Sequence, residues 1–77
     1  GMSPALPVIS GVDAIRVLTK LGYEVSRQRG SHVRLIHPDK RKFGPLSVPL
    51  HKELDAGLLR GLIRDAGITV DQFLSLR

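Results

Sequence analysis

With 77 residues, 42% of them hydrophobic and 25% charged, the chain has the composition of one folded domain with a modest core, which excludes intrinsic disorder and a deeply enclosed site. It has no cysteine and no apolar run near the roughly 20 residues that cross a bilayer, so we expect no disulfide, no thiolate metal site, no membrane partner and a cytoplasmic location. The net charge of +5 favours a polyanionic partner, although a basic surface also serves solubility.

The first part of the chain predicts a short tail followed by a helix. The glycine before the first methionine is typical of tag removal, and we interpret residues 1–9 as a flexible tail within a single domain of residues 1–77. Ser10 and the acid three positions later have the spacing of a capping box, which begins a helix. Gly22 fits the position after its end. One helical face collects Ala14, Ile15, Leu18 and Leu21.

Two strands are predicted next, because apolar and polar residues alternate with a period of two. The first runs from Tyr23 to Arg29, with Tyr23 and Val25 on one side. The second covers residues 32–37, and its side chains expected to face the core are Val33 and Leu35. The opposite face of this strand then carries His32, Arg34 and Ile36.

A third, short strand follows a turn. Pro38, Asp39 and Lys40 have the composition of a tight turn, so the strands on either side of it are expected to pair antiparallel. Leu46 and Val48 alternate with one polar residue and are bounded by prolines, which are tolerated at the edge of a sheet. We therefore expect an edge strand here.

Two helices complete the chain. Asp55 is the predicted N-cap of the longer one and Gly67 the residue after its end, and its apolar face consists of Leu59, Leu62, Ile63 and Ala66. Thr69 and Gln72 repeat the capping-box spacing for a short final helix, with a hydrophobic staple formed by Ile68 and Phe73.

The order αβββαα predicts an α+β fold. Each helix has a single apolar stripe to bury, which is most easily done by stacking the helices on one face of a three-stranded antiparallel sheet. The other face of the sheet is then expected to remain in contact with water. Among the aromatic residues, Tyr23 and Phe73 are expected in the core, so contacts to a nucleic acid would be dominated by its phosphates rather than by base stacking.

The excess positive charge is concentrated in the middle third of the chain. Residues 26–52 contain one acid, Asp39, against seven basic residues, namely Arg27, Arg29, Arg34, Lys40, Arg41, Lys42 and Lys52. Such a concentration is the electrostatic footprint of a phosphate-binding surface, whereas its alternative is an ordinary solvated turn. Arg27 follows the register of Tyr23, so the direction in which the two arginines of the first strand point stays open.

His32 is the candidate catalytic residue. An exposed imidazole beside arginines is sufficient, in principle, to cleave RNA without a metal. The imidazole takes the proton of the ribose 2′-hydroxyl, and the oxygen then attacks the phosphorus. The cations stabilise the charge that develops on the phosphate. Imidazole suits this role because it exchanges protons near neutral pH. The alternative is a surface histidine without a function.

The other two histidines have different expected roles. His37, at the end of the second strand, is interpreted as structural, and His51 either assists proton transfer and phosphate binding or caps local backbone groups. Three histidines without a cysteine or a helical pair at i, i+4 do not have the pattern of a zinc site. We therefore expect neither a metal nor a cofactor.

Several motifs closely resemble the HicA (YcfA-like) toxin family, and the similarity extends from Gly11 to Leu76. They are Leu21-Gly22-Tyr23-Glu24, Arg27-Gln28-Arg29-Gly30-Ser31-His32, Pro49-Leu50-His51-Lys52, and Gly57-Leu58-Leu59-Arg60 with Ala66-Gly67-Ile68. The segment Phe43-Gly44-Pro45-Leu46 departs from the family pattern, which leaves the register of the edge strand open.

The resemblance implies a double-stranded-RNA-binding-domain-like fold and ribosome-independent cleavage of messenger RNA, with His32 as the catalytic residue. Gly30 and Ser31 would shape the entry to the strand and assist phosphate contact. The implied partner is a HicB-type antitoxin that covers the histidine. Two other functions remain: a non-catalytic module that binds double-stranded RNA, and a protein whose basic face only docks an antitoxin.

Overall fold

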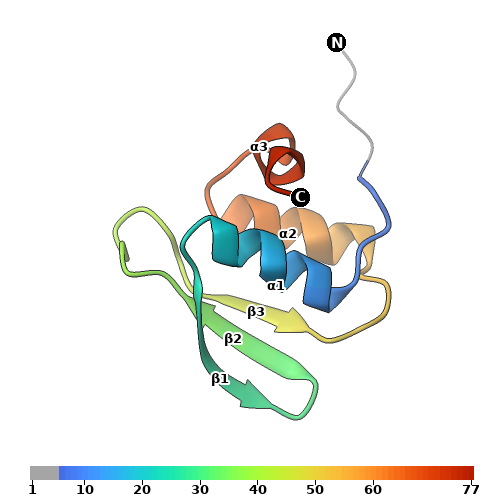
Figure 1. Cartoon of the computed structure of the whole chain (residues 1–77), viewed down its shortest axis with the longest axis horizontal. Helices are drawn as coiled ribbons and strands as arrows, with labels where there is room; N and C mark the ends of the chain where they lie inside the picture. Colours follow the sequence, from blue (N-terminus) through green and yellow to red (C-terminus); the bar gives the residue numbers. More distant parts are fainter. Residues whose placement is uncertain (1–5) are drawn as a thin grey trace.

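The computed structural model describes residues 6–77 and has the predicted order of elements. The three strands form one antiparallel sheet in the order β1-β2-β3, and α1 and α2 lie together on one side of it while α3 packs against α2 (Figure 1). This confirms the α+β fold of the double-stranded-RNA-binding-domain type. The elements are α1 (Gly11–Lys20), β1 (Glu24–Arg29), β2 (His32–Ile36), β3 (Leu46–Pro49), α2 (Ala56–Asp65) and α3 (Val70–Ser75).

All three helices begin at the predicted caps. The Ser10 hydroxyl accepts a hydrogen bond from the Asp13 amide at 3.1 Å, and the Asp55 carboxylate accepts two from the first turn of α2. Thr69 and Gln72 form a complete capping box at α3. Each cap satisfies amide groups that have no partner within the helix, so these sites determine where each helix starts. None of the helices in residues 6–77 has the length and apolarity needed to span a membrane.

The core lies between the sheet and the helices, and β2 supplies its centre. Val33 is 4% and Leu35 0% exposed, whereas His32 and Arg34 are exposed, as the alternation predicts. The edge strand β3 has the register Leu46 opposite Leu35 and Val48 opposite Val33. The largest side chains buried around these strands are Tyr23, Leu18, Leu59 and Phe73.

The prediction for β1 is wrong in one respect. Val25 was expected to share the environment of Tyr23, but it is 58% exposed, and every residue of β1 is exposed. The cause is the position of the strand: β1 lies at the edge of the sheet away from α1 and α2, which both contact β3 (Figure 1). The helices therefore cover β2 and β3 and leave β1 in water on both faces.

An aromatic cluster joins the β2–β3 loop to the core. His37 stacks on Phe43 with ring centroids 4.0 Å apart, and Tyr23 meets both rings edge-on. The His37 Nε2 lies 3.0 Å from the Leu21 carbonyl oxygen, and its Nδ1 accepts a hydrogen bond from the Asp39 amide. These contacts agree with a structural role for His37. Phe43, which was not expected in the core, is only 9% exposed.

The start of α1 is tied to the segment that follows β3. The Gly11 amide donates to the His51 carbonyl oxygen at 2.9 Å, the Leu54 amide donates to the Ile9 carbonyl oxygen, and Ile9 is 2% exposed. The core therefore extends into the last part of the segment expected to be a tail. Leu6 also packs against the core, whereas Val8 is exposed, and residues 1–5 of that segment lie outside the described residues.

The close approach of α1 to β3 predicts a large effect of Gly11→Ala. A Cβ at this position would collide with the Pro49 carbonyl oxygen, so we expect the free energy of unfolding to fall by about 1–3 kcal/mol. Gly61→Ala is the matched control, because in α2 the new methyl meets nothing nearer than Arg64 Nη2 at 3.8 Å, and the gain in helix propensity should stabilise by about 0.5–1 kcal/mol. Urea denaturation measures both. A Gly11→Ala variant as stable as the wild type would contradict this packing.

The raised pKa of Tyr23 predicts that the fold loses stability at alkaline pH. Burial, with a smaller contribution from the Asp65 carboxylate, raises the pKa of the Tyr23 phenol above 10.0. The phenol ionises more readily in the unfolded chain. Its contribution to the free energy of unfolding is therefore complete below about pH 10 and is lost as the pH rises through the folded-state pKa.

Thermal denaturation from neutral to alkaline pH, compared between the wild type and Tyr23→Phe, tests this. The variant loses the 2.7 Å hydrogen bond from the phenol to the Gly44 carbonyl oxygen, which should cost about 1 kcal/mol at neutral pH. Its alkaline loss should be smaller than that of the wild type. Equal alkaline losses in the two proteins would show that Tyr23 does not cause the effect.

Candidate functional site

A shallow depression lies on the face of the sheet that the helices do not cover. Its volume is about 130 Å³, and all of its lining side chains are exposed. They come from all three strands: Arg27, Arg29, His32, Arg34 and Ser47. Four of these are predicted site residues, so the structure brings the candidate histidine together with three arginines.

The register of the sheet places each of these residues. His32 pairs with Arg29 on β1 and with Pro49 on β3. Arg34, two positions along β2, pairs with Arg27 and with Ser47. Because residues paired across adjacent strands share a face, the arginines of β1 and Ser47 lie on the outward face that carries His32.

The register shift in β1 aims its arginines at this face. Val25 pairs with Leu35, and an unbroken register would pair Arg27 with Val33, on the core side of the sheet. The shift after Val25 instead pairs Arg27 with Arg34 and Arg29 with His32. A β-bulge inserts one residue and so moves the following side chains to the opposite face. This settles the orientation that the sequence left open.

The depression is positively charged without compensation. The ion pairs within residues 6–77 join Arg16 to Asp13 and Arg64 to Asp65, both on helices. No carboxylate lies within ion-pair distance of the arginines around His32 in this part of the chain. Arg27 and Arg34 are moreover directly opposed like charges. The site therefore attracts anions.

The remaining predicted residues are spread around this centre. Gly30 and Ser31 form the turn between β1 and β2, and Gly30 has φ +54°, which favours glycine. The carbonyl oxygen of Ser31 also accepts a hydrogen bond from the Leu50 amide at 2.6 Å, which holds the start of β2 against the segment after β3. His51 and Lys52 are exposed in that segment but do not line the depression.

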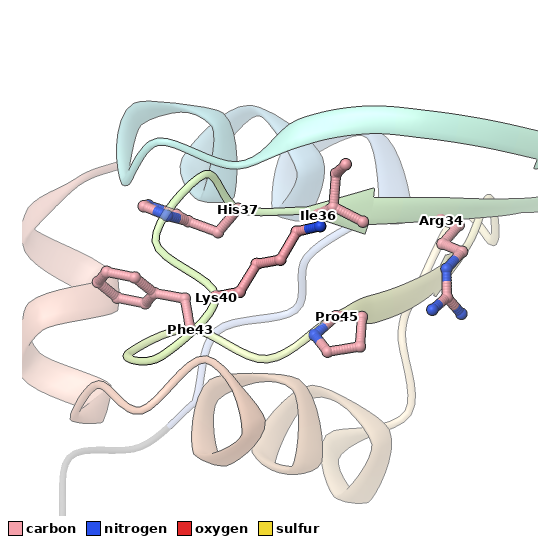
Figure 2. A pocket seen from close by; sticks show the side chains of 6 residues that line it. All are labelled: Arg34, Ile36, His37, Lys40, Phe43 and Pro45. Atoms are coloured by element: carbon pink, nitrogen blue, oxygen red, sulfur yellow. The ribbon is translucent and has the colours of Figure 1, made fainter.

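The basic run of the β2–β3 loop lies at the other end of β2. Arg41 and Lys42 are exposed, and the Lys42 ammonium is 5.3 Å from the centre of the Phe43 ring. Lys40 lines a second hollow of about 210 Å³, shown in Figure 2. This hollow shares Arg34 with the first, and its complete lining is Arg34, Ile36, His37, Lys40, Phe43 and Pro45.

Ser47 is a site residue that the sequence analysis missed. It is the polar residue between the two buried apolar residues of β3, so alternation alone assigns it to the outward face. Its place beside Arg34 depends on the register, which the sequence left open. Among residues 6–77 no group of three or more metal-ligating side chains comes together.

The opposed arginines predict that removing one of them stabilises the fold. Arg34→Gln is expected to raise the free energy of unfolding at low salt by about 0.2–1 kcal/mol, because directly opposed like charges destabilise a sheet. High salt should abolish the gain by screening. Lys52→Gln is the control, since it removes the same charge from an exposed loop position. If the two variants melt alike at low salt, the repulsion between Arg27 and Arg34 is not significant.

One comparison with known proteins identifies the family of the chain. Residues 11–68 match the family model described as the HicA toxin of bacterial toxin-antitoxin systems. A search of the curated proteins finds no match. The matched region contains the whole sheet, both depressions and the helix α2. Because it covers well over half of the 77 residues, the chain belongs to the HicA toxin family.

Proposed function

We propose that this toxin is an endoribonuclease that cleaves messenger RNA in the cytoplasm, with His32 as its catalytic residue. The observation that carries the proposal is the exposed imidazole of His32 in a depression with Arg27, Arg29 and Arg34. A general base next to uncompensated cations supplies both requirements of RNA cleavage by the neighbouring hydroxyl. The family membership supports the toxin role.

The proposed reaction uses groups of the chain and of the RNA alone. His32 removes the proton of a ribose 2′-hydroxyl, and the oxygen forms a bond to the adjacent phosphorus. The bond from phosphorus to the 5′-oxygen of the next nucleotide breaks, and that oxygen takes up a proton from the His32 imidazolium or from a second donor such as His51. The arginines stabilise the charge on the pentavalent phosphorus centre. The products are a 2′,3′-cyclic phosphate and a 5′-hydroxyl.

The other basic residues would hold the RNA rather than cut it. Arg34 and Lys40 lie along β2 and its following loop, and Arg41 and Lys42 are exposed in the same loop. Lys52 is exposed in the segment after β3, so these cations can contact different phosphates of one RNA strand. Gly30 and Ser31 would let the backbone approach a phosphate at the entry to β2. His51 lies two residues after Pro49, the partner of His32 in the sheet, and is the candidate for a second proton-transfer group.

The antitoxin partner follows from the same surface. A toxin whose catalytic residue lies on an open sheet face is silenced by covering that face. We propose that a HicB-type antitoxin does so with an acidic surface, which would neutralise the arginines of β1 and β2. The toxin would then be active only when the antitoxin is removed.

The test is incubation of a purified messenger RNA with the wild type, His32→Ala and His51→Ala in excess chelator. We expect cleavage by the wild type, a loss of at least about 100-fold in His32→Ala, and a smaller loss in His51→Ala. Because His32 is exposed, its variant should melt at the wild-type temperature, which excludes unfolding as the cause.

Three other outcomes would contradict the proposal. Equal cleavage by the wild type and His32→Ala would remove His32 from the reaction. No cleavage by either, with binding to RNA retained and weakened by salt, would show a non-catalytic RNA-binding module. No affinity for RNA together with tight binding of the antitoxin would indicate a role in protein interaction only.

A further inference from the structure

We propose that the second hollow, between β2 and the β2–β3 loop, binds the base of an unpaired nucleotide near the scissile phosphate. This rests on the proposed function and adds to it a subsite that recognises single-stranded RNA. The hollow has a volume of about 210 Å³. Since a cavity of about 150 Å³ holds a benzene molecule, this hollow accommodates a single base.

The walls of the hollow have the chemistry of a base-binding site. Ile36 and Pro45 supply most of the accessible apolar surface. The rings of His37 and Phe43 also line the hollow, but they stack on each other with centroids 4.0 Å apart, and Phe43 is only 9% exposed. Unpaired bases have apolar faces that are buried favourably against such a surface, and the contact tolerates different bases because each has such a face. Phosphate contacts alone, which the sequence indicates, do not require these walls.

Two cations flank the apolar surface. Figure 2 shows Lys40 extending from the loop toward Ile36, with Arg34 further along β2. Neither cation forms an ion pair within residues 6–77. The acid of the same loop, Asp39, accepts a hydrogen bond from the Lys42 amide at 3.3 Å and forms no ion pair with Lys40 or Arg34 within residues 6–77. A nucleotide fits this arrangement, because its base meets the apolar walls and its phosphate meets a cation.

The hollow is adjacent to the candidate catalytic site, with which it shares one lining residue. Arg34 lines both depressions, so a phosphate held by it lies between them. His32 and Ile36 are four positions apart on β2, about 13 Å in an extended strand. The base in the hollow would therefore belong to a neighbour of the nucleotide that is cut. RNA would run along β2, from the turn at Gly30 toward the β2–β3 loop.

Binding measurements in the His32→Ala background test this without cleavage. The probes are a fluorescent single-stranded RNA and an oligonucleotide of the same length and charge that lacks its bases. We expect the RNA to bind at least about five-fold more tightly than the abasic probe. Ile36→Thr should remove most of this preference and leave the abasic affinity unchanged. Val25→Ala is the matched control, an exposed apolar strand residue outside both depressions, and should change neither.

The comparison of the two probes needs no variant of the hollow, so it remains a test if Ile36→Thr does not fold. Lys40 lies in an exposed loop, and Lys40→Ala should weaken the binding of both probes equally. The slope of log K against the logarithm of the salt concentration should fall by about one, as expected for the loss of one phosphate contact. Equal affinities of the two probes, or an equal loss of both in Ile36→Thr, would overturn the proposal.

A peptide of alternating Glu and Leu distinguishes a protein occupant from RNA. If its binding depends on Ile36 while that of the RNA does not, the hollow docks a protein and the base-binding proposal fails. Failure of the proposed function appears separately, as a wild-type protein that binds these probes but does not cleave RNA.

Discussion

The burial of Val33 and Leu35 is the constraint on which the site depends. Their side chains, 4% and 0% exposed, occupy the centre of the core, and each is worth roughly 1.5–3 kcal/mol when fully buried. Because side chains of a strand alternate between faces, this burial forces His32 and Arg34 outward. A slip of one residue would expose both apolar side chains and bury an imidazole and a guanidinium. The packing that folds the domain therefore also presents its candidate catalytic residue.

The bulge in β1 is the second determinant, and it works against stability. It moves Arg27 and Arg29 to the face of His32, where Arg27 directly opposes Arg34 without a carboxylate nearby. Such an arrangement is unfavourable in the free protein and becomes favourable when an anion is bound. An RNA phosphate and an acidic antitoxin surface would both relieve the same repulsion, so the RNA and the antitoxin would compete for one set of charges on the toxin.

Local patterns in the sequence were sufficient for the helices, the core face of β2 and the edge strand. Capping residues such as Ser10, Asp55 and Thr69 act within a few positions, and the alternation around Leu35 needs no knowledge of neighbouring strands. Features set by pairing between strands could not be predicted. The bulge after Val25, the place of Ser47 beside Arg34 and the burial of Phe43 under His37 all depend on which segments meet in the fold.

The central claim is that His32 activates a ribose 2′-hydroxyl. It is tested most directly with a short RNA that the wild type cleaves and the same RNA with a single 2′-deoxynucleotide at the cleaved position, both in excess chelator. The account predicts 2′,3′-cyclic phosphate and 5′-hydroxyl ends from the first substrate and no cleavage at that position in the second. Cleavage of the 2′-deoxy substrate, or products with 5′-phosphate and 3′-hydroxyl ends, would contradict it.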